Sequence, residues 1–219
     1  METMKEAMKL FSEASRRNKG PIGDVLQELL TEPGLVLEVG SGTGQHAVAF
    51  SHRFPHLTWQ PTNAGGPDTL KSVAAYREEA DLPNLRAPQS FDLFDDLSTV
   101  EAEDRFGADQ IVAIVAINVI HIAPADAIDH LFRHADHLLP ASGILFLYGP
   151  FRHPDRPLEP SNEQFHRFLQ NRDPRSGIRD LTLVDEIASR SGFTRAGIQR
   201  LPANNDALWY QRDTRSQAH

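Results

Sequence analysis

Three glycines at alternate positions, Gly40, Gly42 and Gly44, mark the stretch of this chain best suited to bind a ligand. The apolar run of residues 35–39 before them predicts a strand buried on both faces. An amphipathic helical pattern begins directly after them. Strand, glycine turn and helix form the nucleotide-binding corner of doubly wound α/β folds. Glycines suit that corner because the backbone turns sharply and a ligand lies against it with no Cβ in the way.

The spacing of the glycines selects among ligands. A dinucleotide fingerprint counted from Gly40 needs glycine or alanine where Gln45 stands, and the P-loop pattern G-x-x-x-x-G-K-[ST] occurs nowhere in the chain. The stretch E-x-G-x-G-x-G resembles motif I of the class I S-adenosylmethionine (SAM) methyltransferases. That resemblance implies SAM as cofactor, S-adenosylhomocysteine as product, and an acid that supports the loop and the amino group of the cofactor. The implied cofactor contacts are Glu38, Gly40, Ser41, Gly42, Thr43, Gly44 and His46.

Two further cofactor contacts are expected at other strand ends, because ligands of open α/β sheets lie outside the carboxyl ends of the strands. In class I methyltransferases an acid after the third strand binds the adenine amino group, and the resemblance assigns this role to Asp92, next to Leu93. The alternative for Asp92 is a solvated loop acid. The ribose position, usually an acid after the second strand, falls on Asn63. An uncharged amide there indicates either weaker cofactor binding or a shifted strand register.

Three residues after the fourth and fifth predicted strands are candidates for chemistry on the methyl acceptor. His121 could be a general base, since imidazole titrates near neutrality; a histidine hydrogen-bonded to the loop backbone is an equal alternative. Asn118 could orient the acceptor and contact the cofactor, or hold the loop. Tyr148 and Phe151 could wall the methyl site, although aromatic residues at a strand end are more often core.

One predicted helix carries an acid and three histidines at a spacing that could form a metal site. The residues recur at helical spacing, but apolar side chains already occupy the core face of that helix, which leaves these residues on a flanking, wetter face. The sequence therefore predicts no metal site. The residues concerned are Asp126, His130, His134 and His137.

The elements that must position these residues alternate between strand and helix. Strands are predicted at 35–39, 57–61, 85–93, 110–117, 144–148, 193–200 and 206–212. Helices are predicted at 3–16, 21–30, 45–53, 68–76, 124–139, 161–170 and 180–191. Five βα units followed by two strands close in sequence is the class I methyltransferase order. The resemblance implies an α/β, Rossmann-like fold with a seven-stranded, mostly parallel sheet, helices on both faces and an antiparallel last strand.

A closer resemblance rests on short runs spread in order along the chain. They are similar to the family of small methyltransferase-like proteins, bacterial and animal, classified as a domain of unknown function. The similarity covers about residues 12–212 and implies the class I fold and SAM dependence, but no substrate. The runs are 17–19, 42–46, 59–61, 117–122, 147–151, 160–162, 179–181 and 202–205.

Composition narrows the classes of partner and location. The 219 residues fit one domain, with 1–34 as an N-terminal helical cap and 213–219 as a disordered tail. The formal net charge of −8 disfavours a nucleic-acid substrate, because such a field repels phosphate backbones. The absence of cysteine excludes disulfides, iron–sulfur clusters and thiolate nucleophiles. With no apolar run long enough for a membrane or a signal peptide, a cytoplasmic location is expected.

Together these features predict a SAM-dependent methyltransferase acting on a small molecule. A non-catalytic SAM-binding or protein-interaction module with the same fold is the alternative. A nucleotide-dependent oxidoreductase is a weaker rival, because Gln45 breaks the dinucleotide fingerprint. The acceptor atom and the oligomeric state are not specified by the sequence. Two segments, 16–19 and 149–160, are candidates for a lid that excludes water.

Overall fold

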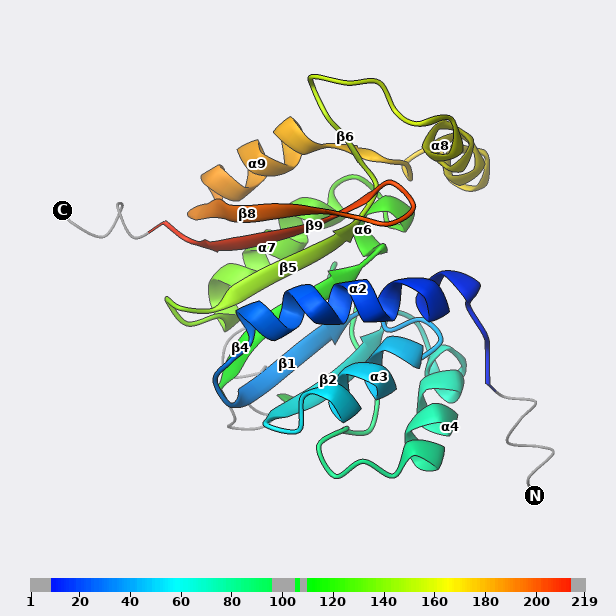
Figure 1. Cartoon of the computed structure of the whole chain (residues 1–219), viewed down its shortest axis with the longest axis vertical. Coiled ribbons are helices and arrows are strands. Elements are labelled where there is room, and N and C mark those ends of the chain that lie inside the picture. The colour runs from blue at the N-terminus through cyan, green and yellow to red at the C-terminus, as the bar shows by residue number, and fades with distance from the viewer. Residues whose placement is uncertain (1–8, 96–104, 107–109, 214–219) are drawn as a thin grey trace.

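A seven-stranded sheet organises the chain in the computed structural model, which describes residues 9–95, 105–106 and 110–213. The strand order across the sheet is β3-β2-β1-β4-β5-β9-β8 (Figure 1). A separate two-stranded sheet pairs β6 (Phe151–Arg152) with β7 (Arg179–Asp180). The strands of the main sheet are β1 (Gly34–Val39), β2 (Leu57–Asn63), β3 (Gln89–Ser90), β4 (Ile111–Ile117), β5 (Ile144–Gly149), β8 (Phe193–Leu201) and β9 (Asn205–Arg212).

The direction of the strands confirms the predicted fold class. Neighbouring strands from β3 to β5 run parallel, whereas β9 is antiparallel to both β5 and β8. The last two strands therefore form a hairpin that adds β8 at the sheet edge and places β9 inside it. This is the seven-stranded, mostly parallel sheet with an antiparallel last strand that the resemblance implies.

Helices cover both faces of the sheet (Figure 1). Alternate residues of β1 face opposite layers, as strand geometry requires: Leu35 and Leu37 belong to one apolar cluster and Val36 to the other. The first cluster includes α7 (Ala127–Leu138) and α9 (Leu181–Arg190), and the second includes α2 (Glu13–Leu29) and α3 (Gln45–Arg53). The remaining helices are η1 (Pro67–Leu70), α4 (Lys71–Ala80), α6 (Val119–Ile122) and α8 (Pro160–Arg172).

The N-terminal region differs from the prediction of two helices separated at residues 17–20. Helix α2 runs without a break through Pro21. Its N-cap is Ser12, whose hydroxyl accepts the Ser15 N–H at 3.2 Å. Ile22 and Leu26 are fully buried against the sheet. Burying this apolar stripe compensates for the hydrogen bond that proline cannot donate, so the predicted break is wrong. Residues 3–8 of the predicted first helix lie outside the described residues.

The third strand is shorter than predicted. Only Gln89 and Ser90 pair with β2, and an isolated bridge joins Leu85 to Trp59. The loop that follows lies largely outside the described residues. At the other end, the Asp213 N–H donates to the Gly192 carbonyl at 2.8 Å, and residues 214–219 of the predicted tail also lie outside the described part of the chain.

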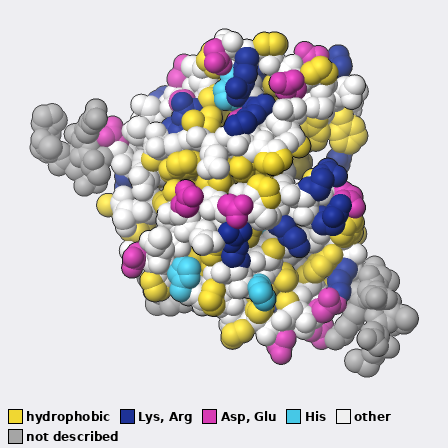
Figure 2. All heavy atoms as spheres, in the orientation of Figure 1, with side chains coloured by type: hydrophobic (Ala, Val, Ile, Leu, Met, Phe, Trp, Pro, Cys, Tyr) yellow, Lys and Arg dark blue, Asp and Glu magenta, His cyan; other side chains and the backbone are white. Residues whose placement is uncertain are grey.

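Two findings bear on partners. Within the described residues, no helix combines the length and the apolar character needed to cross a membrane. On the face drawn in Figure 2, acidic and basic side chains are interspersed.

Candidate functional site

The glycine corner at the end of β1 has a left-handed backbone at all three glycines. The φ angles are +69° at Gly40, +56° at Gly42 and +95° at Gly44, a region that residues with a Cβ rarely adopt. A Cβ on Gly40 would meet Val119 at 2.7 Å, and one on Gly44 would meet the Val73 backbone at 2.8 Å. A Cβ on Gly42 would meet only the Gly40 carbonyl, at 4.0 Å. Packing thus requires the outer glycines, whereas Gly42 faces open space where a ligand can approach the backbone.

The Asn63 side chain holds this corner in place. Its Oδ1 accepts the Gly42 N–H at 2.8 Å, and its Nδ2 donates to the Gly42 carbonyl at 3.2 Å and to the Thr69 carbonyl at 2.8 Å. Asn63 ends β2, where a ribose ligand was expected, but both of its amide hydrogens are already used by the backbone. The structure explains the amide at this position, since a carboxylate has no hydrogen to donate to either carbonyl.

Glu38 lies beneath the corner and is 1 % exposed. It faces the α2 and α3 side of the sheet, where its Oε2 accepts the Trp59 Nε1–H at 2.8 Å. Burial raises the pKa of the Glu38 carboxyl to about 7, against the lowering effect of hydrogen bonds from Trp59 and Ser41. The Glu38 carbonyl accepts the Thr62 hydroxyl at 2.8 Å, and the Ser41 N–H donates to the Thr62 carbonyl at 2.8 Å. Glu38 therefore helps to hold the glycine loop against the end of β2.

Asp92 and Leu93 lie at the same edge of the sheet as Asn63. The Phe91 N–H donates to the Asn63 carbonyl at 3.0 Å, which brings the ends of β2 and β3 together. Asp92 is half-buried, and its Oδ1 accepts the Phe94 N–H at 3.1 Å. Leu93 is buried, and its carbonyl is 2.9 Å from His134 Nε2. Among the described residues, no hydrogen bond is made to the second carboxylate oxygen of Asp92.

Asn118 follows β4 in a left-handed conformation, with φ +60° and ψ 11°. Such a conformation in a residue other than glycine is uncommon and is concentrated at functional sites. The Asn118 N–H donates to the Tyr148 carbonyl at 2.7 Å, which joins the ends of β4 and β5. This contact turns the chain sharply into α6 and places the Asn118 side chain in a cavity described below.

His121 is fully buried, at 0 % exposure. Its ring lies 5.1 Å from the Phe151 ring, edge to face, and a Cβ on Gly149 would overlap it. Neither ring nitrogen has a hydrogen-bond partner among the described residues. Burial, and then the charge of Arg179, lower the pKa of His121 to about 3. The imidazole is therefore enclosed by Gly149 and Phe151. It does not line the cavity described below, where a general base would have to lie.

His46 and Tyr148 connect the corner to the cavity through Asn18 of α2. His46 Nε2 lies 2.7 Å from Asn18 Oδ1, and burial lowers the pKa of His46 to about 4. The amide oxygen can only accept, so the neutral imidazole donates through Nε2. The Tyr148 hydroxyl lies near the side chains of Asn18 and Asn205, and burial raises its pKa. Helix α2 thus takes part directly in the site.

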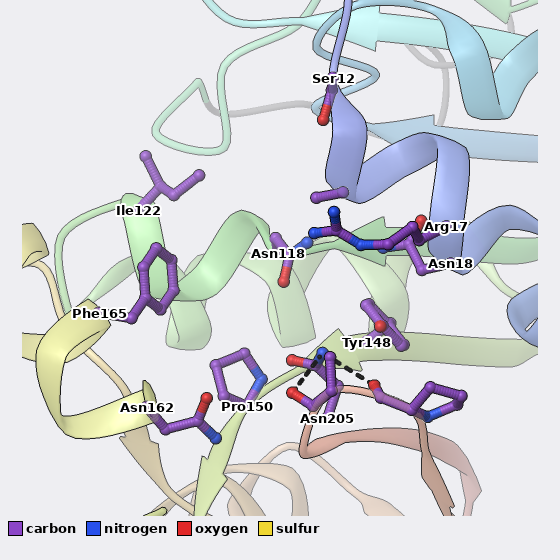
Figure 3. A pocket seen from close by; sticks show the side chains of 13 residues that line it. Ser12, Arg17, Asn18, Asn118, Ile122, Tyr148, Pro150, Asn162, Phe165 and Asn205 are labelled. Atoms are coloured by element: carbon purple, nitrogen blue, oxygen red, sulfur yellow. Dashed lines mark hydrogen bonds between the residues drawn. The ribbon is translucent and has the colours of Figure 1, made fainter. Parts of the chain in front are cut away.

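A cavity of about 420 Å³ opens beside these residues (Figure 3). Six parts of the chain form it: α2 with its N-cap, the β4 end, α6, the β5 end, α8 and the β8–β9 hairpin. Of the predicted catalytic residues, Asn118 and Tyr148 line it. Sequence reasoning gave no site role to most of the others, although several belong to the runs that carry the family resemblance. The lining residues are Ser12, Ala14, Arg17, Asn18, Asn118, Ile122, Tyr148, Pro150, Asn162, Phe165, Pro202, Ala203 and Asn205.

The histidines of α7 that could form a metal site make other contacts. His134 of α7 bonds the Leu93 carbonyl, and His130 packs 4.8 Å from the Phe94 ring. Across the described residues no group of three or more histidine or acidic side chains is placed to hold a metal ion.

Several solved structures with a similar fold are named as methyltransferases. An O-methyltransferase family protein from Burkholderia thailandensis is 18 % identical with a TM-score of 0.71, and the match covers 97 % of this chain and 59 % of that one. Human N-acetylserotonin methyltransferase, solved in complex with SAM, is 16 % identical with a TM-score of 0.71, over 96 % of this chain and 55 % of that one. An O-methyltransferase family 2 protein from Planctomyces limnophilus, solved with apigenin, is 16 % identical with a TM-score of 0.71, over 89 % and 56 %.

The chain therefore spans a little more than half the length of these structures, and at such identities the likeness shows the fold. Residues 9–212 match a family described as a protein of unknown function, DUF938. The match covers nearly the whole chain and agrees with the resemblance seen in the sequence. The chain is a member of the DUF938 family with the Rossmann-like fold of the class I methyltransferases.

Proposed function

We propose that this protein is a SAM-dependent methyltransferase that acts on a small molecule. The observation that carries the proposal is the open space at Gly42, next to a cavity at the carboxyl edge of the sheet. Two contacts connect corner and cavity: Ser12 N–H to Gln45 Oε1 at 2.7 Å, and Asn18 to His46. A cofactor on the glycine corner and an acceptor in the cavity would then be neighbours.

The residues at the corner fit the cofactor implied by the fold. The Gly42 backbone can lie against it without a Cβ, and the free carboxylate oxygen of Asp92 can accept a hydrogen bond from the adenine amino group. When bound, SAM supplies a methyl group activated by a positive sulfur. The chain's task is then to align the acceptor and exclude water, which account for much of the rate of such a displacement.

The cavity suits a small acceptor. Its volume of about 420 Å³ lies within the range of ligand pockets, and its lining combines apolar side chains with a few polar groups. Asn118 and Tyr148 line it from the ends of β4 and β5, so they are the groups placed to orient an acceptor.

Thermal denaturation with S-adenosylhomocysteine tests cofactor binding. A ligand at about 100 times its Kd adds about 2.7 kcal/mol to the free energy of unfolding, which raises the Tm of a chain this long by about 5–10 °C. Gly42→Asn should abolish the shift, because asparagine tolerates a left-handed backbone but fills the open space. Gly192→Asn is the matched control, since Gly192 has φ +75° and nothing within 4 Å of an added Cβ; it should keep the shift.

Transfer of labelled methyl from SAM to small molecules of a cell extract separates the enzyme from a non-catalytic module. Label in small-molecule products that disappears with Gly42→Asn supports the methyltransferase. A Tm shift without transfer to any extract supports a non-catalytic SAM-binding module, and no shift in folded protein contradicts the proposed function altogether.

A further inference from the structure

The charge of the cavity indicates what kind of acceptor it can take. Among its described lining residues only Arg17 and Tyr148 have ionisable side chains, and no carboxylate lines it. Arginine is permanently protonated. Glu13 neutralises it only in part, since Glu13 is 2.8 Å from Arg16 but 3.9 Å from Arg17. The cavity therefore carries a positive charge that an anion can balance.

Hydrogen-bond donors gather at the end of the cavity next to the glycine corner. The Asn18 oxygen is bound by His46, so its amide nitrogen faces the Tyr148 hydroxyl and has a second hydrogen for a ligand. The Tyr148 hydroxyl is protonated at neutral pH, since burial raises its pKa. Figure 3 shows the Arg17 side chain extending into the cavity in the direction of Asn118. Three donors around one space match the several lone pairs of a carboxylate.

The opposite end of the cavity offers an acceptor. The Asn162 amide nitrogen donates to the Asn204 carbonyl at 2.9 Å, which leaves its oxygen for the cavity. Asn205, by contrast, lies beside the Tyr148 hydroxyl, and its amide nitrogen donates to the carbonyls of Pro202 and Ala203 at 3.3 and 3.2 Å, as the dashed lines in Figure 3 show. Apolar side chains, Ile122, Pro150 and Phe165, also line the cavity. A fitting ligand has an anionic end, an apolar body and a donor such as hydroxyl away from the anionic end.

No described lining residue can remove a proton from an acceptor at neutral pH. The ionisable groups behind the lining have other contacts. His46 donates to Asn18, and His121 is enclosed by Gly149 and Phe151. His166 accepts the Ile178 N–H at 3.0 Å, and the buried Asp206 is held by His153 at 2.8 Å and by Arg200. The acceptor atom must therefore carry a free lone pair on arrival.

We infer that the methyl acceptor is a small carboxylic acid, bound as its carboxylate by Arg17, Asn18 and Tyr148 and converted to a methyl ester. This inference rests on the proposed function. A carboxylate oxygen forms a bond to the methyl carbon as the carbon–sulfur bond breaks, and that bonding pair stays on sulfur. The products are a neutral ester and S-adenosylhomocysteine, and no proton moves.

Binding is tested first, without turnover. Calorimetric titration of the protein saturated with S-adenosylhomocysteine compares benzoate, 4-hydroxybenzoate and phenylacetate with the corresponding amides. Each acid should bind at least tenfold more tightly than its amide. Arg17→Gln should remove that preference. Arg16→Gln is the matched control, because Arg16 loses the same charge one residue away, is exposed and does not line the cavity; it should change affinity less than twofold.

Transfer is tested with SAM labelled on its methyl group, using the same acids and the acidic small molecules of a cell extract. Alkali releases the methyl group of an ester as volatile methanol, whereas ethers, methylamines and thioethers keep it. We expect alkali-volatile label, lost with Arg17→Gln and kept with Arg16→Gln. The rate should be level from about pH 6 to pH 9, because a carboxylate with a pKa near 4 needs no base.

Several results would overturn the inference. They are label that is stable to alkali, equal binding of acids and amides, equal effects of the two arginine substitutions, or no transfer to any acid by protein that binds S-adenosylhomocysteine. None of these results would contradict cofactor binding. Failure of the proposed function is recognised separately, because folded protein would then show no Tm shift with S-adenosylhomocysteine.

Discussion

The amide of Asn63 hydrogen-bonds to both backbone groups of Gly42, accepting its N–H at 2.8 Å and donating to its carbonyl at 3.2 Å. One side chain at the end of β2 thereby holds the central glycine of the corner in its left-handed conformation. The other side of Gly42 is open, so the loop already has this shape before any ligand approaches. Preorganisation of that kind lowers the entropy lost on binding.

This relationship reverses an expectation drawn from charge alone. A carboxylate at position 63 would accept from ribose more strongly than an amide, but it would also face the carbonyls of Gly42 and Thr69 without a hydrogen to donate. We predict that Asn63→Asp lowers the free energy of unfolding by about 2–4 kcal/mol, since each unsatisfied buried acceptor costs about 1–3 kcal/mol. It should also weaken S-adenosylhomocysteine about tenfold in calorimetric titration.

Asn84→Asp is the control for that prediction. The Asn84 amide nitrogen also donates to backbone carbonyls, those of Ser51, Phe54 and Leu57, at 2.9, 3.2 and 2.9 Å. Its loss should cost similar stability and leave cofactor affinity unchanged. If Asn63→Asp bound S-adenosylhomocysteine more tightly, residue 63 would instead contact the ribose hydroxyls.

The second prediction concerns Asp92. One oxygen of its carboxylate accepts the Phe94 N–H, and no other described residue hydrogen-bonds the second oxygen, which can accept from the adenine amino group. Asp92→Ala should weaken S-adenosylhomocysteine about tenfold, as expected for one lost hydrogen bond to a charged acceptor, with a Tm close to wild type. Asp95→Ala, an exposed acid on the same loop, should bind like wild type. Equal affinity of both variants would place adenine elsewhere.

The third prediction separates packing from catalysis at His121. His121→Gln keeps most of the volume but cannot take up a proton. Because the wild-type ring does not reach the cavity, turnover should stay within about threefold, and the free energy of unfolding should fall by about 1–2 kcal/mol. A loss of about 10²–10⁴-fold in turnover at wild-type stability would identify the histidine as a general base.

Acid titration gives an independent check on His121. Its pKa is lowered from 6.5 to about 3, so between those values the unfolded chain binds a proton that the folded chain does not. Wild-type stability should therefore fall as pH drops below about 6.5, by at most about 1.4 kcal/mol per pH unit from this group. Chemical denaturation from pH 7 to pH 4 should show a shallower fall for His121→Gln.

The fourth prediction concerns Glu38, whose pKa is raised from 4.5 to about 7. Between these values the folded chain holds a proton that the unfolded chain releases, so the stability contributed by this group is full below pH 4.5 and is lost as pH rises to 7. The shift corresponds to about 3 kcal/mol. Glu38→Gln can still accept the Trp59 N–H, and it should remove this dependence.

The difference in unfolding free energy between wild type and Glu38→Gln is the measurement, at pH 4 and pH 8. His46 and His121, with lowered pKa values, act in the opposite direction over the acidic range, but they are present in both proteins and cancel. A difference that does not change with pH would mean that the Glu38 carboxyl has the same pKa in the folded and the unfolded chain.

The sheet could be predicted because its signals are local. The apolar runs that form β1, β4 and β5 are buried on both faces. The order of the strands in the sheet was predicted from the resemblance of the glycine motif to class I methyltransferases. The predicted helix break before Pro21 was wrong because helix propensity alone does not include the stabilisation from burying Ile22 and Leu26. The length of the third strand was overestimated because the residue types in 85–93 do not indicate where pairing with β2 begins and ends.

The site was predictable at the strand ends but not between distant segments. Asn118 and Tyr148 follow directly from the strand-end rule. Arg17, Asn162 and Asn205 meet only through the packing of a helix and a hairpin far apart in sequence. The burial of His121 depends on Gly149, a contact that spacing does not reveal.

The cavity joins residues 12–18 to residues 202–205, whereas the Asn63 contacts that hold Gly42 lie within residues 42–69. Domains generally fold as units during synthesis. Because the cavity is lined from both ends of the described chain, it is complete only after the β8–β9 hairpin has left the ribosome. Recognition of an acceptor would then await a finished chain.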